Sequence, residues 1–377
     1  MKLERPIPIK SALRFPQGRF GGSLKGEGAV RLGAGLVSAI VSKSPQYAPS
    51  KIWWGMARPH TQGMNPARTI ACSAGLPNSV IGATINMACG SGLQAVFSAA
   101  QDIAAGAYEC VLAGGSESMS DTPFLLPGLR WGYQIGHREA PDVMYQDGLK
   151  CPITNLLMGQ TIERLADKHG VSRRDADEYA FESHRRASHA DFAQERIPHS
   201  LLGHDECIRF NAAIDDFSAL GPVYGPGGQI TAGNASAISD GAAAIVLTSS
   251  TIGASGSLAH ILGWSEVALE PIDMGFGPVP AVLALLKQHN LNVSDIALWE
   301  LNEAFAAQAI CCARALKLPM DRLNIAGGGI SLGHPIGASG ARVLATLIHQ
   351  LRRLGGGLGI ATLGVGGGIG QAVLVEV

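Results

Sequence analysis

The sequence predicts an α/β protein made of two similar halves that face each other. In the first half, a turn at Cys89 leads into a helix and then into a buried strand that ends in glycines at residues 109–115. In the second half, a turn at His334 leads into a helix over residues 341–354 and a strand over 359–368 that also ends in glycines. Because this alternating unit occurs twice, we expect a duplicated fold in which the paired turns meet near a pseudo-twofold axis.

Length and composition support a large, well-buried globular protein. The chain has 377 residues, 46% hydrophobic and 16% charged, which suits two or three domains or two fused halves. A net charge of −1 argues against bulk binding to nucleic acid or to a membrane surface. Because the first residues contain no apolar run and no long apolar segment follows, we expect a cytoplasmic protein. The seven cysteines lack paired spacing, so we expect neither a disulfide framework nor a metal site.

Apolar runs and glycine-rich turns predict the elements of the first half. A loop at residues 17–23 is followed by a helix through Ile40, and a short strand is expected at 53–56. Pro66 opens the next helix, where its missing N–H costs nothing. An Ala-rich helix over 93–105 then follows the Cys89 turn.

A more polar segment separates the two halves. Helical spacing is present over residues 160–169 and 174–197, and the second of these stretches is rich in arginine. These arginines could meet an anionic group such as a nucleotide phosphate, although a solvated helix face is the commoner role of such residues. We therefore expect a first half of residues 1–118 plus 236–265, an inserted loop domain of residues 119–235, and a second half of residues 266–377.

Apolar strands and glycine turns return after residue 235. A strand is expected at 243–247 and a helix, opened by Pro280, at 279–287. The segment 295–301 leads directly to Asn302.

Cys89 is the first candidate catalytic residue. It lies where an apolar run gives way to a helix, a position at which free backbone N–H groups and the helix dipole favour the thiolate. The small residues at 90–92 let a substrate approach closely. The alternative is that Cys89 is a small buried hydrophobe, as most single intracellular cysteines are.

His334 and Asn302 are the candidate partners of Cys89. A cysteine nucleophile needs a base for its proton and donors for the oxyanion of its acyl adduct, and His334, in a glycine-dense loop, could serve either need. The side-chain amide of Asn302 could order a water or an oxyanion, or it could cap the helix that follows.

Eight motifs in a fixed order make the chain resemble the thiolases, the CoA-dependent enzymes that make or cleave 3-ketoacyl-CoA. The resemblance implies the thiolase fold, with two βαβαβαββ halves in a layered α-β-α-β-α arrangement and an inserted loop domain. It also implies a homodimer or homotetramer, acyl-CoA as the substrate, and no bound cofactor or metal. The motifs are Gly18–Gly22, Asn65–Arg68, Asn86–Gly92, Ala113–Ser120, Thr231–Ser236, Met274–Pro278, Asn302–Phe305 and the loop around His334.

The resemblance to thiolases also implies roles for single residues. Cys89 would carry the acyl group and His334 would activate it. The side chains of Asn302 and His334 would form one oxyanion hole with a water, and the backbone N–H groups of Cys89 and Gly366 a second. The basic inserted domain would meet the CoA phosphates, and the residues expected to contact CoA are Ser236, Met158 and Ala235.

The chain departs from the thiolase pattern at three positions. Typical members carry a second reactive cysteine where this chain has Gly364, and the sterol-carrier-protein type carries it where this chain has Ala304. Short-chain biosynthetic members carry a histidine in place of Leu157, so a different or bulkier acyl group is compatible with this sequence.

Three outcomes are compatible with the missing thiol. A water or Glu303 could take over proton transfer in a CoA-dependent C-acyltransferase. The chain could instead be a decarboxylative condensing enzyme of the ketoacyl-synthase type. It could also be a non-catalytic scaffold subunit that binds acyl-CoA.

Overall fold

A computed structural model describes residues 1–252 and 256–377, in which the strands join in one ten-stranded mixed sheet. The strand order is β4-β3-β5-β6-β1-β7-β10-β9-β8, with the short β2 joined to β6. β1 pairs with β6 along one part of its length and with β7 along another, so it links the strands of the two halves. The strands are β1 (Lys2–Arg14), β2 (Gly18–Arg19), β3 (Lys51–Gly55), β4 (Ile81–Ile85), β5 (Cys110–Ser118), β6 (Ser239–Thr248), β7 (Ala259–Ala268), β8 (Leu298–Leu301), β9 (Leu358–Val365) and β10 (Ile369–Glu376).

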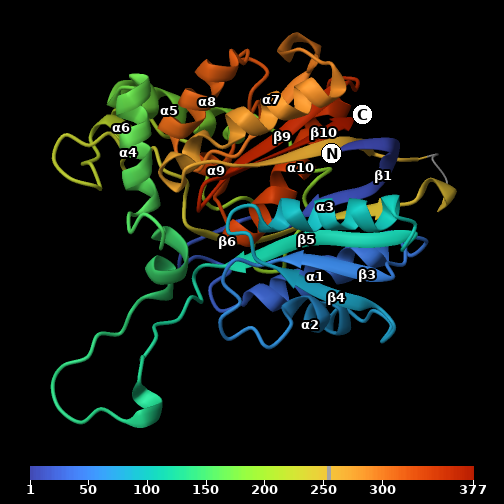
Figure 1. Cartoon of the computed structure of the whole chain (residues 1–377), viewed down its shortest axis with the longest axis horizontal. Helices are drawn as coiled ribbons and strands as arrows, with labels where there is room; N and C mark the ends of the chain where they lie inside the picture. The colour runs from blue at the N-terminus through green and yellow to red at the C-terminus, as the bar shows by residue number, and fades with distance from the viewer. Residues whose placement is uncertain (253–255) are drawn as a thin grey trace.

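Helices cover these strands in layers, which confirms the predicted arrangement. α1 (Ala29–Lys43) and α2 (Pro66–Ser73) pack on the outer face of the first-half strands, and α7 (Pro278–His289) and α8 (Ala306–Leu316) pack on the second-half strands. α3 (Ser91–Ala104) and α10 (Ile336–Arg353) lie between the two halves, in a core that includes strand residues from both (Figure 1). The turns at Cys89 and His334 immediately precede these two central helices.

Glycines allow the two central helices to approach closely. A Cβ at Gly92 of α3 would lie 2.8 Å from the backbone oxygen of Gly337 of α10. A Cβ at Gly340 of α10 would lie 2.2 Å from the backbone nitrogen of Leu93. Since such contacts leave no room for a side chain, the glycines bring the N-terminal ends of α3 and α10 together, and with them the turns that carry Cys89 and His334.

Most elements predicted from the sequence are present, with some differences. Among the longer strands, β1, β7 and β10 were not predicted; in β1, Pro6 and Pro8 are uncommon in a strand. The arginine-rich helix α5 (Arg173–His189) ends eight residues before the predicted position of 197, since Ala190 has an extended backbone conformation. In addition, the domain boundary expected after residue 265 falls inside β7, a strand that pairs along its length with β10.

The inserted segment contains three helices and a long excursion. α4 (Met158–His169) packs against α8, and α5 packs against α6 (Ile214–Ser218), α8 and the short α9 (Gly329–Leu332). Residues 119–157 precede these helices, and the middle of this segment extends away from the body of the molecule before the chain returns to it (Figure 1). This excursion contains only two short helical turns, η1 (Leu129–Trp131) and η2 (Tyr145–Leu149).

Candidate active site

Cys89 and His334 share one cavity between the two halves. The cavity has a volume of about 100 Å³, which is enough for a short acyl group. Its wall is mainly apolar, and its titratable side chains are those of Cys89, His334 and Asp147. The lining residues are Ala57, Asn86, Ala88, Cys89, Asp147, Gly148, Leu149, Met158, Ser236, Met274, Ala304, Phe305, His334, Ile336, Gly364 and Gly366.

Cys89 lies in a tight turn between β4 and α3. Ala88 has a φ of 43°, in the left-handed region that non-glycine residues rarely adopt. Ser91 holds the turn, because its hydroxyl accepts from the N–H of Met87 at 2.9 Å and donates to the carbonyl of Ala88 at 2.7 Å. Burial raises the pKa of the Cys89 thiol above its ordinary value, and a hydrogen bond from the backbone N–H of Gly366 and the positive charge of Arg58 oppose that rise.

His334 is held as a neutral imidazole with its Nε2 free to accept a proton. The hydroxyl of Ser339 donates to the carbonyl of Pro335 at 2.9 Å, so it accepts from the Nδ1–H of His334. This bond assigns the lone pair of the ring to Nε2. Burial, together with the charges of Arg342 and Arg58, lowers the pKa of His334 to about 3. The imidazole is therefore uncharged at neutral pH.

Asn302 faces His334 from the end of β8. Its Nδ2 lies 3.5 Å from Nε2 of His334, and its backbone N–H donates to the carbonyl of Thr362 on β9 at 2.9 Å. The N-cap of the following helix α8 is Phe305, whose side chain makes no capping bond. The capping alternative for Asn302 is therefore wrong, and its amide lies beside the imidazole as the resemblance implied.

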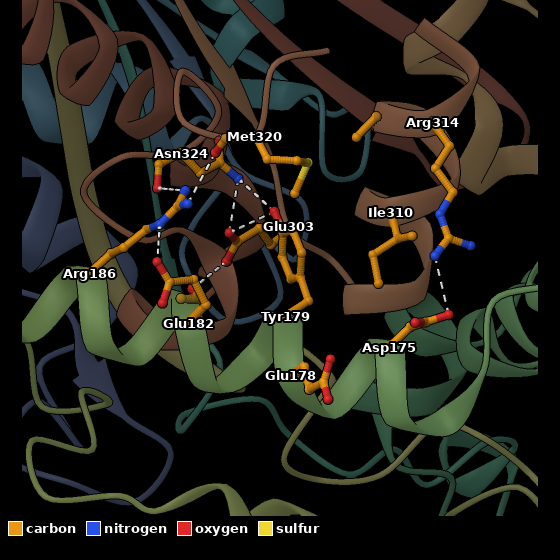
Figure 2. A pocket seen from close by; sticks show the side chains of 12 residues that line it. Asp175, Glu178, Tyr179, Glu182, Arg186, Glu303, Ile310, Arg314, Met320 and Asn324 are labelled. Carbon is orange, nitrogen blue, oxygen red and sulfur yellow. Dashed lines mark hydrogen bonds and ion pairs between the residues drawn. The ribbon is translucent and has the colours of Figure 1, made fainter. Parts of the chain in front are cut away.

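Glu303, the next residue along the chain, belongs to a different environment. It does not line the catalytic cavity but a separate pocket of about 440 Å³ between α5 and α8 (Figure 2). Its carboxylate accepts hydrogen bonds from four donors, one of which is the backbone N–H of Ile330 in α9. The donors are Tyr179 Oη at 3.1 Å, Ser183 Oγ at 2.7 Å, Asn324 Nδ2 at 2.9 Å and the N–H of Ile330 at 3.3 Å. Glu303 is therefore not placed to take over proton transfer in the cavity.

The other predicted site residues divide into two groups. Ser236, Met158 and Gly366 line the cavity with Cys89. Ala235 does not line it; its backbone pairs with Phe305, and it contributes to a separate pocket near Arg209. Sequence reasoning missed Met274 and Gly148, and of these only Met274 lies in a motif that had been recognised.

The predicted phosphate-binding arginines are engaged in contacts within the chain. Arg173 pairs with Asp177, Arg174 with Glu178, and Arg185 and Arg186 with Glu182 on α5, and Arg196 pairs with Asp205. Arg186 also donates to the backbone carbonyl of Leu323 at 2.5 Å. A phosphate at any of these positions would have to compete with a carboxylate.

Gly364 occupies the cavity wall opposite the catalytic turn. A Cβ at this position would lie 2.9 Å from the carbonyl oxygen of Met274 and 3.4 Å from Cδ of Pro278. Cys89 is the one cysteine among the cavity-lining residues, all of which the structure describes. Within the described chain, the cavity therefore contains one thiol and one imidazole but no second thiol.

Two general searches of the described residues complete the description. In residues 1–252 and 256–377, no helix is both long and apolar enough to cross a membrane. The same residues contain no group of three or more His, Cys, Asp or Glu side chains arranged to hold a metal ion.

Family comparison agrees with the geometry over nearly the whole chain. The thiolase N-terminal domain matches residues 7–251, and the thiolase C-terminal domain matches residues 255–377. The chain belongs to the thiolase family. It is thus a thiolase-type acyltransferase.

Individual thiolases are similar to this one along their full length. An acetyl-CoA acetyltransferase of Chromobacterium violaceum is 41% identical, with 98% of this chain and 99% of the relative aligned. The crystal structure of the Bacillus anthracis acetyl-CoA acetyltransferase superposes with a TM-score of 0.95 at 37% identity, covering 100% of both chains. That of human mitochondrial 3-ketoacyl-CoA thiolase in complex with CoA has a TM-score of 0.96 at 35% identity and covers 100% of this chain and 99% of the other.

Proposed function

We propose that this thiolase transfers acyl groups from CoA thioesters through an S-acyl intermediate on Cys89, and so forms or cleaves 3-ketoacyl-CoA. The observation that carries the proposal is the shared cavity, in which a thiol and a neutral imidazole from the two halves meet beside an amide. Similar proteins named as acetyl-CoA acetyltransferases support CoA thioesters as the substrate class.

The proposed first step is an exchange of thioesters. Cys89 Sγ attacks the acyl carbonyl, and its proton passes to Nε2 of His334. The bond from the carbonyl carbon to the CoA sulfur then breaks, and that sulfur takes the proton from His334. Acyl-S-CoA and a thiol become acyl-S-Cys89 and CoA-SH, and the imidazole is neutral again.

Donors in the cavity stabilise the oxyanion of this step. We assign the backbone N–H groups of Gly366, which donates to Sγ in the resting site, and of Cys89 to the oxyanion that forms at the carbonyl under attack. Nδ2 of Asn302 and, once it carries the proton, Nε2 of His334 would bind the thioester oxygen of the second acyl-CoA in the later half-reaction. We assign Ser236 and Met158, which line the cavity, to contact with the part of the CoA arm nearest the thioester.

The second half-reaction needs a proton acceptor in a cavity that lacks a second thiol. Glu303 lies outside the cavity, so we assign this role to His334, which is restored to its neutral form when CoA leaves. In the condensing direction it would accept a proton from the α-carbon of the second acyl-CoA; that carbon attacks the acyl carbonyl, the bond to Sγ of Cys89 breaks, and Sγ takes the proton. Cleavage of 3-ketoacyl-CoA begins with the reverse of this step. The acyl group then leaves Cys89 when His334 accepts the proton of the CoA thiol, the CoA sulfur attacks the acyl carbonyl, and Sγ leaves and takes the proton.

Mass spectrometry after mixing with acyl-CoA tests the proposal. We expect one acyl adduct on Cys89, and loss of at least about 10⁴-fold in labelling rate in Cys89→Ser. Cys72→Ser is the matched control, because Cys72 is an exposed cysteine outside the cavity and should not alter the adduct. Binding of CoA without an adduct on Cys89 would instead support the non-catalytic scaffold.

We also propose that the enzyme is a cytoplasmic homodimer or homotetramer. Large apolar side chains on the 119–157 excursion support self-association, since Trp131 is 86% and Ile135 91% exposed in the single chain. Free cysteines throughout the described chain are compatible with a reducing compartment. Light scattering of the purified protein and fractionation of cells measure these two properties.

A further inference from the structure

Arg58 is a buried charge that the proposed reaction does not use. It follows β3 by three residues, and only 5% of its surface is exposed. Its Nε, Nη1 and Nη2 atoms are all buried, and none of them has a hydrogen-bond partner among residues 1–252 and 256–377. Because a buried charge without partners is costly, an arginine in this state indicates a site that an anion from outside the chain completes.

The acidic groups nearest to Arg58 are engaged elsewhere. Glu117 accepts from the backbone N–H groups of Ala57 at 2.9 Å, Arg58 at 3.2 Å and Gly337 at 3.0 Å. Asp147 forms an ion pair with His60 at 3.0 Å, and Asp142 accepts from the N–H of Met144 at 2.8 Å. These carboxylates contribute charge near Arg58, but the hydrogen-bonding capacity of its guanidinium is left for a ligand.

The guanidinium packs against a residue that lines the catalytic cavity. Gly148 lines that cavity, and a Cβ on Gly148 would lie 2.0 Å from Nη2 of Arg58. Because a side chain at residue 148 would collide with the guanidinium, the glycine lets Arg58 pack directly against this part of the cavity wall. Ala57, the residue before Arg58, also lines the cavity.

We propose that Arg58 binds a carboxylate carried by the acyl group, so that the preferred substrates are CoA thioesters of short dicarboxylic acids. Guanidinium and carboxylate match in charge and in geometry, because two parallel N–H groups can donate to two oxygens. The small volume of the cavity limits the chain between thioester and carboxylate to a few carbons. This assignment rests on the proposed function.

Paired acyl groups of equal length provide the test. Succinyl-CoA and butyryl-CoA both carry four-carbon acyl groups, and only the first has a terminal carboxylate. Labelling of Cys89 is followed for each by rapid quenching and mass spectrometry in the wild type, Arg58→Met and Gly148→Ala. The ratio of the two rates is the readout, because a change in the reactivity of the thiol affects both acyl groups alike.

We expect the wild type to favour succinyl-CoA by at least about tenfold, as a charged hydrogen bond predicts. Arg58→Met should remove that preference, and Gly148→Ala should reduce it by displacing the guanidinium. If the ratio of the two labelling rates is the same in wild type and Arg58→Met, and butyryl-CoA still labels Cys89, the role of Arg58 is overturned. The proposed function is then unaffected. Failure of both acyl-CoAs to label the folded wild type overturns the proposed function, and this assignment with it.

Discussion

Two buried charged residues near the catalytic pair have opposite environments. Glu303, on the α5 side of β8, accepts hydrogen bonds from four donors (Figure 2). Arg58, on the other side of the cavity, donates no side-chain hydrogen bond within the part of the chain that is described. Both are almost fully buried, with 1% and 5% of their surfaces exposed. Glu303 therefore supports the structure around the site, whereas we infer that Arg58 serves to bind a ligand.

The contrast shows what each side of the site contributes. A fully satisfied polar network gives a single arrangement of the elements it joins, and Glu303 joins α5, the Asn324 loop and the start of α9 directly beside Asn302. A buried arginine whose N–H groups make no hydrogen bond contributes little to the stability of the fold. Its presence is better explained by the binding of a ligand. Mutations on the two sides should therefore differ in which property they change.

Removal of Glu303 should have the largest effect. Glu303→Ala removes a buried charged acceptor that four donors share, and we expect a loss of about 3–5 kcal/mol in the free energy of unfolding together with loss of Cys89 labelling. Urea denaturation and acyl labelling measure the two effects. Glu178→Ala, at the exposed rim of the same pocket, should change stability by less than about 0.5 kcal/mol. A stable, fully active Glu303→Ala would show that the network does not support the site.

Introducing a thiol at residue 364, in the cavity wall, should change the catalytic rate more than the stability. If proton transfer limits the second half-reaction, Gly364→Cys should raise the rate of CoA-dependent cleavage by up to about 10²-fold. The new Cβ lies 2.9 Å from the Met274 carbonyl, so we also expect a loss of about 1 kcal/mol in stability. Gly364→Ser introduces the same strain without the thiol and is the matched control. Equal cleavage rates in the two variants would show that another group supplies the base.

Two buried arginines allow a charge that is paired with carboxylates to be compared with one that makes no side-chain hydrogen bond. Arg14→Met should cost about 3–5 kcal/mol, because it removes the buried guanidinium that lies 2.6 Å from the carboxylates of both Glu195 and Asp205 and leaves Asp205 only its weaker pair with Arg196. Arg58→Met should leave the free energy of unfolding unchanged or raise it by about 1 kcal/mol. Chemical denaturation of both variants measures the free energy of unfolding. A large loss of stability in Arg58→Met would mean that the charge of Arg58 already stabilises the folded chain.

The pH dependence of acylation should be nearly flat. The pKa of His334 is lowered to about 3, so the imidazole stays deprotonated at every pH above that value, and the raised pKa of Cys89 keeps the thiol protonated. Between about pH 5 and 8 neither group changes its charge, and the labelling rate should vary by less than about threefold. An acid limb near the ordinary histidine pKa, measured by labelling across that range, would contradict a neutral buried imidazole.

Local sequence signals singled out Cys89 and His334, which the structure brings into one cavity, but not Arg58 and Gly148. Cys89 and His334 stand out because glycine-rich turns and helix starts are visible in a short window, and the family motifs identified Asn302 and Gly366. Arg58 and Gly148 lie far apart in the sequence. Their contact depends on tertiary packing, which a short stretch of sequence does not reveal. For the same reason the apolar periodicity after α5 was misleading, since Phe192 and Ile197 are buried although the helix ends at His189.

The glycine crossing between α3 and α10 has a consequence for how catalytic competence arises. Cys89 and His334 lie 245 residues apart in the sequence, and they face each other only once the two central helices have docked. Bringing such distant segments together carries a loop-closure entropy that local contacts do not offset, so this step should come late in folding. Acyl labelling of Cys89 during refolding would then report completion of the native state, whereas helix content would recover earlier.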